Sequence, residues 1–167
     1  MDTWGARLHK DLLILPESEE VHKGQDPDIE AFSAFTKDKS KESSKLEKIL
    51  AKIGATDLYV CGLALDVCVK ATCLDGLKLG YKLAVIEDCC RGIDNDGIKE
   101  AKKLIVDSGG LVTNSDHVIS MVNDGKRSLI MAHHAANAIS KENFNLVDDK
   151  YLSTCSSLHQ NRIEQRL

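Results

Sequence analysis

Short apolar stretches alternate with amphipathic helical patterns along residues 44–122, and this alternation limits the fold more than any other feature of the chain. Each apolar stretch has the length of a single buried strand, and the three lie at 58–61, 83–87 and 111–113. Helical spacing of apolar residues surrounds them, over 44–53, 66–80, 97–107 and from Ser115. Because buried strands that alternate with helices form covered parallel sheets, we expect an α/β fold with helices on both faces of a parallel sheet.

Polar residues mark the expected helix starts. Ser44 and Glu47 have the spacing of a capping box before the first helix. Asp66 and Ser115 stand at the starts of two later helices, and we interpret both as side chains that cap those helices. On this interpretation Asp66 has a structural role.

Composition limits the classes of partner and location. The chain has 167 residues, enough for one domain with its own core, and a formal charge of −4 with acids and bases mixed along its length. This balance argues against a nucleic-acid or membrane surface. No apolar stretch approaches the roughly 18 residues of a membrane-spanning helix, and the amino end lacks a signal-peptide core. We therefore expect a cytoplasmic protein.

The six cysteines fit a reducing compartment, and their spacing lacks the paired CxxC motif of a zinc module. Cys61 falls in an expected strand and Cys73 on the buried face of the next helix, so we expect both to be small core residues. Cys89 and Cys90 follow the expected strand 83–87, near the edge of the sheet where ligands bind. A functional role for either of them is the less favoured interpretation.

Cys68 is the cysteine best placed for chemistry, since it lies just past the carboxyl end of one strand, in the first turn of a helix. Free N–H groups and the helix dipole at such a position favour an anion and would stabilise a thiolate. The same N–H groups could hold the oxyanion that forms when a thiolate attacks an amide. From these residues alone, a nucleophile and a buried structural cysteine remain equally open.

Four ordered motifs carry a resemblance to a known family. The segment Gly62-Leu63-Ala64-Leu65-Asp66-Val67-Cys68-Val69-Lys70-Ala71-Thr72 resembles the nucleophile segment of the isochorismatase-like hydrolases, and among these of the nicotinamidases. Lys23-Gly24 with Phe32-Ser33-Ala34-Phe35 resembles the segment that carries the catalytic lysine of that family. Thr3–His9 and Asp88 with Arg91-Gly92 resemble two further family segments, so that the resemblance runs from Asp2 to Val122.

The resemblance implies a role for each matching residue. Cys68 would be the nucleophile, with Lys23 beside it to favour the thiolate, although an exposed loop lysine is the simpler alternative for Lys23. The backbone N–H groups of Ala64 and Cys68 would be the oxyanion donors, with a cis peptide at Leu63-Ala64.

Three aromatic residues are the substrate-binding candidates that the resemblance implies. Trp4 would stack on a pyridine ring, and Phe32 and Phe35 would enclose it. The alternatives are an anchored amino end for Trp4 and core packing for the two phenylalanines.

One part of the family pattern is not matched. Family members begin with a strand that ends in a catalytic aspartate, and then carry an Asp/His cluster that binds a divalent metal (Zn, Mn or Fe). The resemblance here starts after both, so we expect no metal ligands in this chain and a sheet without its first strand. The chain thus resembles an amino-terminally shortened member, either a short isoform or an incomplete gene product, with a partial hydrolase domain over 1–122. Residues 123–167 would form a partly helical or disordered extension.

The implied function is the hydrolysis of nicotinamide to nicotinate and ammonia through a cysteine thioester, a step of NAD metabolism and pyridine nucleotide salvage. Without the aspartate and the metal, we expect weak or no activity from this chain. Two alternatives remain: another hydrolase of the superfamily, acting on isochorismate or an N-carbamoyl compound, and a non-catalytic short form that binds partners. An exposed apolar sheet edge would also favour a homo-oligomer.

Overall fold

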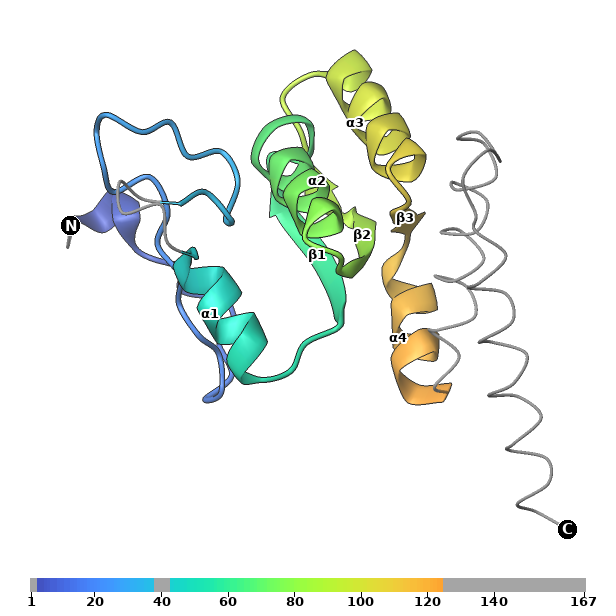
Figure 1. Ribbon diagram of the computed structural model, residues 1–167, viewed down its shortest axis with the longest axis horizontal. Coiled ribbons are helices and arrows are strands. Elements are labelled where there is room, and N and C mark those ends of the chain that lie inside the picture. Colours follow the sequence, from blue (N-terminus) through green and yellow to red (C-terminus); the bar gives the residue numbers. More distant parts are fainter. Residues whose placement is uncertain (1–2, 38–42, 125–167) are drawn as a thin grey trace, which may run out of the picture.

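The computed structural model describes residues 3–37 and 43–124, which form an α/β domain (Figure 1). The expectation for 123–167 falls almost entirely outside the described residues. A 3₁₀ turn, Trp4–Ala6, lies in the irregular amino-terminal segment, and a π-helical turn, Leu65–Val69, lies between the first strand and the second helix. The elements in chain order are helix α1 (Lys45–Lys52), strand β1 (Asp57–Leu63), helix α2 (Lys70–Lys78), strand β2 (Lys82–Arg91), helix α3 (Asn95–Asp107), strand β3 (Leu111–Thr113) and helix α4 (Ser115–Asp124).

The three strands form a parallel sheet in the order β1-β2-β3, so β1 is an edge strand in the described part of the chain. Leu58 lies opposite Leu83 and Ala84 opposite Leu111. The register between β1 and β2 shifts after Val60, so that Gly62 lies opposite Cys90. The shift aligns the last residues of the two strands, so that Leu63 lies opposite Arg91 at the carboxyl edge of the sheet.

Helices cover both faces of this sheet, as the sequence predicts. On one face, α2 and α3 enclose a core that includes Val69, Cys73 and Ile105 with Leu83 and Val85 of β2. On the other face, Met121 of α4 packs with Ala84 and Leu111, and Tyr59 borders this second cluster. Full burial of an aliphatic side chain such as Leu83 contributes roughly 1.5–3 kcal/mol, so the central strand anchors the fold.

The helix starts confirm one predicted cap and correct another. Ser44 and Glu47 form the predicted capping box at the start of α1. At the start of α4, however, Asn114 accepts the hydrogen bond from the backbone N–H of His117, so Asn114 and not Ser115 caps this helix. Ser115 is instead bound to Asp88, which accepts from its backbone N–H at 2.9 Å and from its hydroxyl at 2.6 Å. The Ser115 hydroxyl, for which the sequence pattern predicts a capping role, therefore binds Asp88 of strand β2 instead.

The cysteines correct two further expectations. Strand β2 continues to Arg91, so Cys89 and Cys90 belong to the strand and do not follow it. Cys73 is fully buried, as predicted, but Cys61 is exposed. Cys61 lies beyond Tyr59 at the carboxyl end of an edge strand, past the cluster that α4 forms with the sheet.

The amino-terminal segment has little regular structure. Residues 12–15 have no regular secondary structure and are exposed, and no strand forms over 3–37. This segment lies beside α1 in Figure 1, and the Lys45 ammonium donates to the carbonyl of Glu20 at 2.8 Å between them. Among the helices described, none has the length and apolar character needed to cross a membrane.

Candidate active site

Cys68 lies in the π-helical turn Leu65–Val69, directly after β1, and its side chain is half-buried. The carbonyl of Ala64 accepts hydrogen bonds from the N–H groups of Val67 and Val69, at 3.1 and 3.0 Å, which close the turn around Cys68. Short π-helical turns are frequent at functional sites. The peptide bond between Leu63 and Ala64 is cis, as the resemblance implies.

Lys23 meets this thiol from a segment 45 residues earlier in the chain. Its ammonium nitrogen lies 3.5 Å from Cys68 Sγ and donates a second hydrogen bond to the carbonyl of Ala31 at 2.9 Å. The structure therefore brings together the two side chains for which catalytic roles are expected.

A compact loop holds Lys23 in this position. Gly24, with φ +66°, adopts the left-handed conformation that favours glycine and turns the chain directly after Lys23. Asp26 then accepts from the N–H of Asp28 at 3.0 Å through its side chain, and from the N–H of Ile29 at 3.2 Å through its carbonyl. The loop returns the chain so that the carbonyl of Ala31 faces the lysine.

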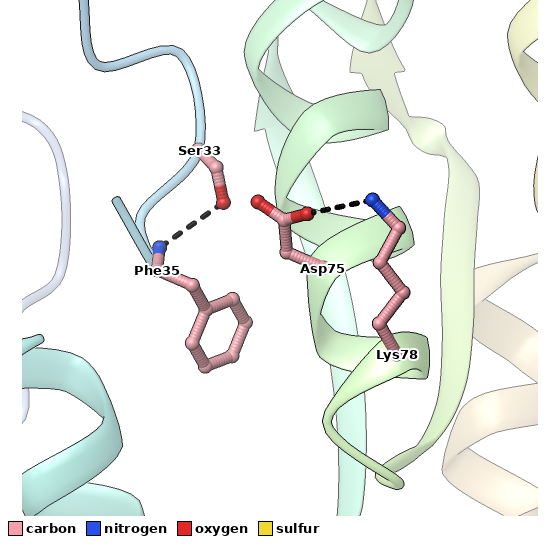
Figure 2. Close-up of polar contacts among 4 residues, drawn as sticks. All are labelled: Ser33, Phe35, Asp75 and Lys78. Carbon is pink, nitrogen blue, oxygen red and sulfur yellow. Dashed lines mark hydrogen bonds and ion pairs between the residues drawn. The ribbon is translucent and has the colours of Figure 1, made fainter. Parts of the chain in front are cut away.

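The next part of this segment packs on helix α2. Phe35 is buried, and its ring stacks on Tyr81 with ring centroids 6.0 Å apart. The hydroxyl of Ser33 accepts from the N–H of Phe35 at 3.1 Å, and Figure 2 shows this pair facing the helix that carries Asp75 and Lys78. Gly76 permits the approach, because a Cβ there would lie 3.2 Å from the ring of Phe35.

The aromatic candidates differ in environment. Phe35 is in the core, which fits the packing alternative, while Phe32 is 45% exposed and Trp4 is 88% exposed. Neither exposed ring belongs to the contacts that join Lys23 and Cys68. Substrate binding by Trp4, Phe32 and Phe35 stays a prediction.

Asp66 corrects the expectation of a helix cap. Its carboxylate accepts from the N–H of Ile93 at 3.1 Å and from the N–H of Asp94 at 3.0 Å, so it holds the turn between β2 and α3. These N–H groups, first that of Asp94, keep the pKa of Asp66 below its ordinary value. Asp66 is structural, as expected, but through partners that the sequence spacing does not reveal. Gly92 was the available signal, because a tight turn next to a carboxylate requires a residue without a side chain.

Thr72 is the residue that the sequence reasoning missed. Its hydroxyl accepts from the N–H of Ala34 at 3.0 Å and donates to the carbonyl of Cys68 at 2.8 Å. The donation follows the usual bond of a helical threonine to the carbonyl four residues earlier. The hydrogen bond from the Ala34 N–H joins α2 to the amino-terminal segment, and the local spacing of residues does not predict it.

A metal centre is a family feature that the described residues do not fit. Across 3–37 and 43–124, no group of three or more His, Cys, Asp or Glu side chains is arranged to hold a metal ion. Divalent cations in proteins need several such ligands at short distance.

Comparison with known proteins defines the class to which this fold and site belong. Residues 1–117 match the family described as the isochorismatase domain. The match covers more than half of the 167 residues, and it includes both Lys23 and Cys68. The chain belongs to the isochorismatase family.

Within that family, the proteins similar to this chain include nicotinamidases from a bacterium and a yeast. The nicotinamidase of Escherichia coli K12 is 41% identical over 90 residues, which cover 54% of this chain and 42% of that protein. The nicotinamidase of Saccharomyces cerevisiae is 35% identical over 98 residues, covering 57% of this chain and 45% of that protein. The chain thus matches less than half of the length of either relative.

A solved structure agrees with the fold. The pyrazinamidase of Pyrococcus horikoshii, solved in complex with zinc, superposes with a TM-score of 0.58 at 32% identity. The superposition covers 68% of this chain and 59% of that one. A hydrolase fold with a parallel sheet and flanking helices is therefore common to both chains.

Proposed function

We propose that this chain is a nicotinamidase-type amidohydrolase, in which Cys68 is the nucleophile and Lys23 its charged partner. The observation that carries the proposal is the distance of 3.5 Å between Lys23 Nζ and Cys68 Sγ. The names of its relatives support nicotinamide as the substrate. The reaction would belong to pyridine nucleotide salvage in the cytoplasm.

The first half of the reaction forms a thioester. The Cys68 thiolate attacks the amide carbon, a C–S bond forms, and the carbonyl oxygen becomes an oxyanion. The C–N bond then breaks, and the leaving nitrogen takes a proton from the Lys23 ammonium and departs as ammonia. Lys23 lies close enough to the sulfur to serve both the thiolate and the leaving group.

The second half releases the acid. Water attacks the thioester carbon, the C–S bond breaks, and the thiolate returns. The proton that water loses restores the Lys23 ammonium, and the carboxylic acid gives its proton to the ammonia, so nicotinate and ammonium are the net products. We assign the oxyanion to the backbone N–H groups of Ala64, which directly precedes the turn that carries the nucleophile, and of Cys68 within it.

We expect a slow reaction. The partners described for Cys68 are an ammonium group at the sulfur and a threonine hydroxyl at the carbonyl, and neither is a carboxylate. General acid–base catalysis by a well-placed group typically contributes about 10²–10⁴ in rate. Turnover by this chain should therefore lie well below that of an enzyme with a carboxylate beside the thiol.

Ammonia release from nicotinamide by the chain of 167 residues tests the proposal. Cys68→Ala should abolish release, and Lys23→Ala should reduce it. Cys89→Ala is the matched control, because it removes an exposed cysteine outside the proposed site. Loss of isochorismate or of an N-carbamoyl compound, each followed as consumption of the substrate itself, would identify another hydrolase of the family.

Two results would contradict the proposal. Release that survives in Cys68→Ala would exclude Cys68 as the nucleophile. No release from a folded sample, with and without added Zn²⁺, Mn²⁺ or Fe²⁺, would favour a non-catalytic chain that binds partners.

A further inference from the structure

The hydroxyl of Thr72 makes two hydrogen bonds to different parts of the chain. It donates to the carbonyl of Cys68 at 2.8 Å, within the same helical stretch. It accepts from the backbone N–H of Ala34 at 3.0 Å, in a segment 38 residues earlier. A single side chain thus connects the nucleophile turn with the segment that follows Lys23.

These bonds close a ring of contacts around the catalytic pair. Lys23 Nζ contacts Cys68 Sγ at 3.5 Å and the carbonyl of Ala31 at 2.9 Å. Ala31 leads in three residues to Ala34, whose N–H returns through Thr72 to Cys68. Every step from the thiol back to its own carbonyl is therefore a hydrogen bond or a short piece of backbone.

Apolar packing alone does not fix the position of this segment. The ring of Phe35 is buried against Tyr81, which anchors the segment to the domain, but apolar contacts have little directionality. A hydrogen bond requires a defined distance and angle. The bond from Ala34 to Thr72 can therefore set where Ala31, and with it Lys23, lies along the helix.

A purely local role explains only half of the geometry. Threonine in a helix commonly donates to the carbonyl four residues earlier, and the bond to Cys68 has this form. This local bond does not explain why the hydroxyl also accepts from the N–H of Ala34. Without Thr72, that half-buried N–H would need another acceptor. The second bond is the one that reaches the lysine segment.

We propose that Thr72 is a positioning residue, whose hydroxyl holds the amino-terminal segment so that the Lys23 ammonium stays within contact of the Cys68 sulfur. The inference rests on the pairing of Cys68 and Lys23 in the proposed function. Thr72 acts through Lys23 and not on the substrate. It therefore matters for the reactivity of the thiol even before any amide is bound.

The rate at which iodoacetamide alkylates Cys68 at pH 7 tests this role, measured on the peptide that contains Cys68. Thr72→Val removes the hydroxyl and keeps the shape, so we expect alkylation to slow about fivefold, as when a cation leaves contact with a thiolate at a partly exposed site. Thr72→Ser keeps the hydroxyl and should restore the rate. Thr36→Val, in the same segment but outside the ring of contacts, is the matched control and should not change the rate.

A double substitution separates positioning from a general structural effect. In a Lys23→Ala chain the cation is already absent, so adding Thr72→Val should slow alkylation no further. The inference is overturned if Thr72→Val reacts at the rate of the unsubstituted chain, or if it slows alkylation equally with and without Lys23.

A second measurement serves if the valine variant fails to fold. The amide hydrogen of Ala34 in the unsubstituted chain should exchange slowly with solvent, because it is bonded to Thr72. Exchange at the rate of an exposed loop amide would overturn the inference. Neither measurement uses nicotinamide, so a chain that alkylates as expected but releases no ammonia would refute the proposed function and leave the role of Thr72 intact.

Discussion

At the scale of single residues, the carboxylate of Asp66 shows how a residue next to the nucleophile can stabilise another part of the domain. It is buried, and it binds the N–H groups of Ile93 and Asp94 at the start of α3. The N–H of Asp94, then that of Ile93, lowers its pKa, because hydrogen bonds to a carboxylate favour the charged form. The folded state therefore holds Asp66 charged to a lower pH than the unfolded chain does.

We predict that Asp66→Asn weakens the dependence of stability on pH. The folded pKa lies below the unfolded value of about 4, so the contribution of Asp66 is fully present above pH 4 and is lost as pH falls through the folded pKa. The variant should melt at a lower temperature at pH 7, and its midpoint should fall less steeply between pH 4 and pH 3. Asp88 keeps part of the dependence, because the Ser115 hydroxyl also lowers its pKa.

Thermal unfolding followed by circular dichroism across this pH range measures both effects. Asp96→Asn is the control, because Asp96 is an exposed acid on α3 that pairs with Lys99 at the surface. Equal losses in the two variants at pH 7 would contradict a special role for Asp66.

Cys73 gives a second prediction at this scale. Burial, and to a smaller extent the neighbouring Cys90, raises the pKa of its thiol to about 12. We expect Cys73 to stay unlabelled by iodoacetamide in the folded protein at pH 8 and to react only after unfolding, because the thiolate is the reactive form. Mass spectrometry of the separate peptides measures this, and labelling of native Cys73 as fast as that of Cys68 would contradict it.

At the scale of elements, the turn between β2 and α3 is packed so tightly that no side chain fits at Gly92. A Cβ on Gly92 would lie 2.5 Å from Ile98 Cγ1 and 2.8 Å from Asp66 Oδ1. Gly92→Ala must displace either the carboxylate or the helix, and overpacking of this kind costs about 1–3 kcal/mol. We therefore predict a clear loss in the free energy of unfolding, measured by urea denaturation.

Gly5→Ala is the matched control for this substitution. A Cβ on Gly5 meets no atom within 4 Å, so this variant should unfold at the urea concentration of the unsubstituted chain. Equal stability of the two variants would show that the turn can relax around a side chain.

The element scale also shows what local sequence patterns can predict. The strand at Leu111–Thr113, the box at Ser44 and the buried position of Cys73 follow from periodicity and are present in the structure. Periodicity does not predict the carboxyl end of β2 or the cap of α4. Both depend on residues far apart in the chain, through the shifted register and the Asp88–Ser115 bond. Exposure of Cys61 likewise depends on strand order and not on its local sequence.

In the candidate site, too, some features follow from local sequence and others depend on tertiary contacts. The position of Cys68 after a strand follows from the local pattern, while its pairing with Lys23 was implied only by the family resemblance. Thr72 was missed because its bond to Ala34 spans 38 residues. Contacts of this range are set by tertiary packing, which a single sequence does not encode in any short motif.

At the scale of the whole molecule, β1 leaves one edge of the described sheet unpaired. Leu63 at its end is 74% exposed, and exposed edges with apolar side chains promote association between chains. We predict that the protein associates as its concentration rises. Sedimentation velocity in the presence of a reducing agent measures this without interference from disulfides.

A charge placed on this edge should reduce the association. Cys61→Lys adds it at an exposed position of β1, and lysine on an edge strand opposes strand pairing. Cys89→Lys adds the same charge at an exposed position of the inner strand β2 and is the control. An equal effect of both variants would point to net charge and not to the edge.

The claim that joins these scales is that Cys68, held beside Lys23 by the amino-terminal segment, forms a thioester with its substrate. The most direct measurement is mass spectrometry of the chain after acid quenching during incubation with nicotinamide. We predict a nicotinoyl group on the peptide that contains Cys68, and none on that peptide in Cys68→Ala. A folded chain that releases ammonia without this adduct, or carries the group on another residue, would contradict it.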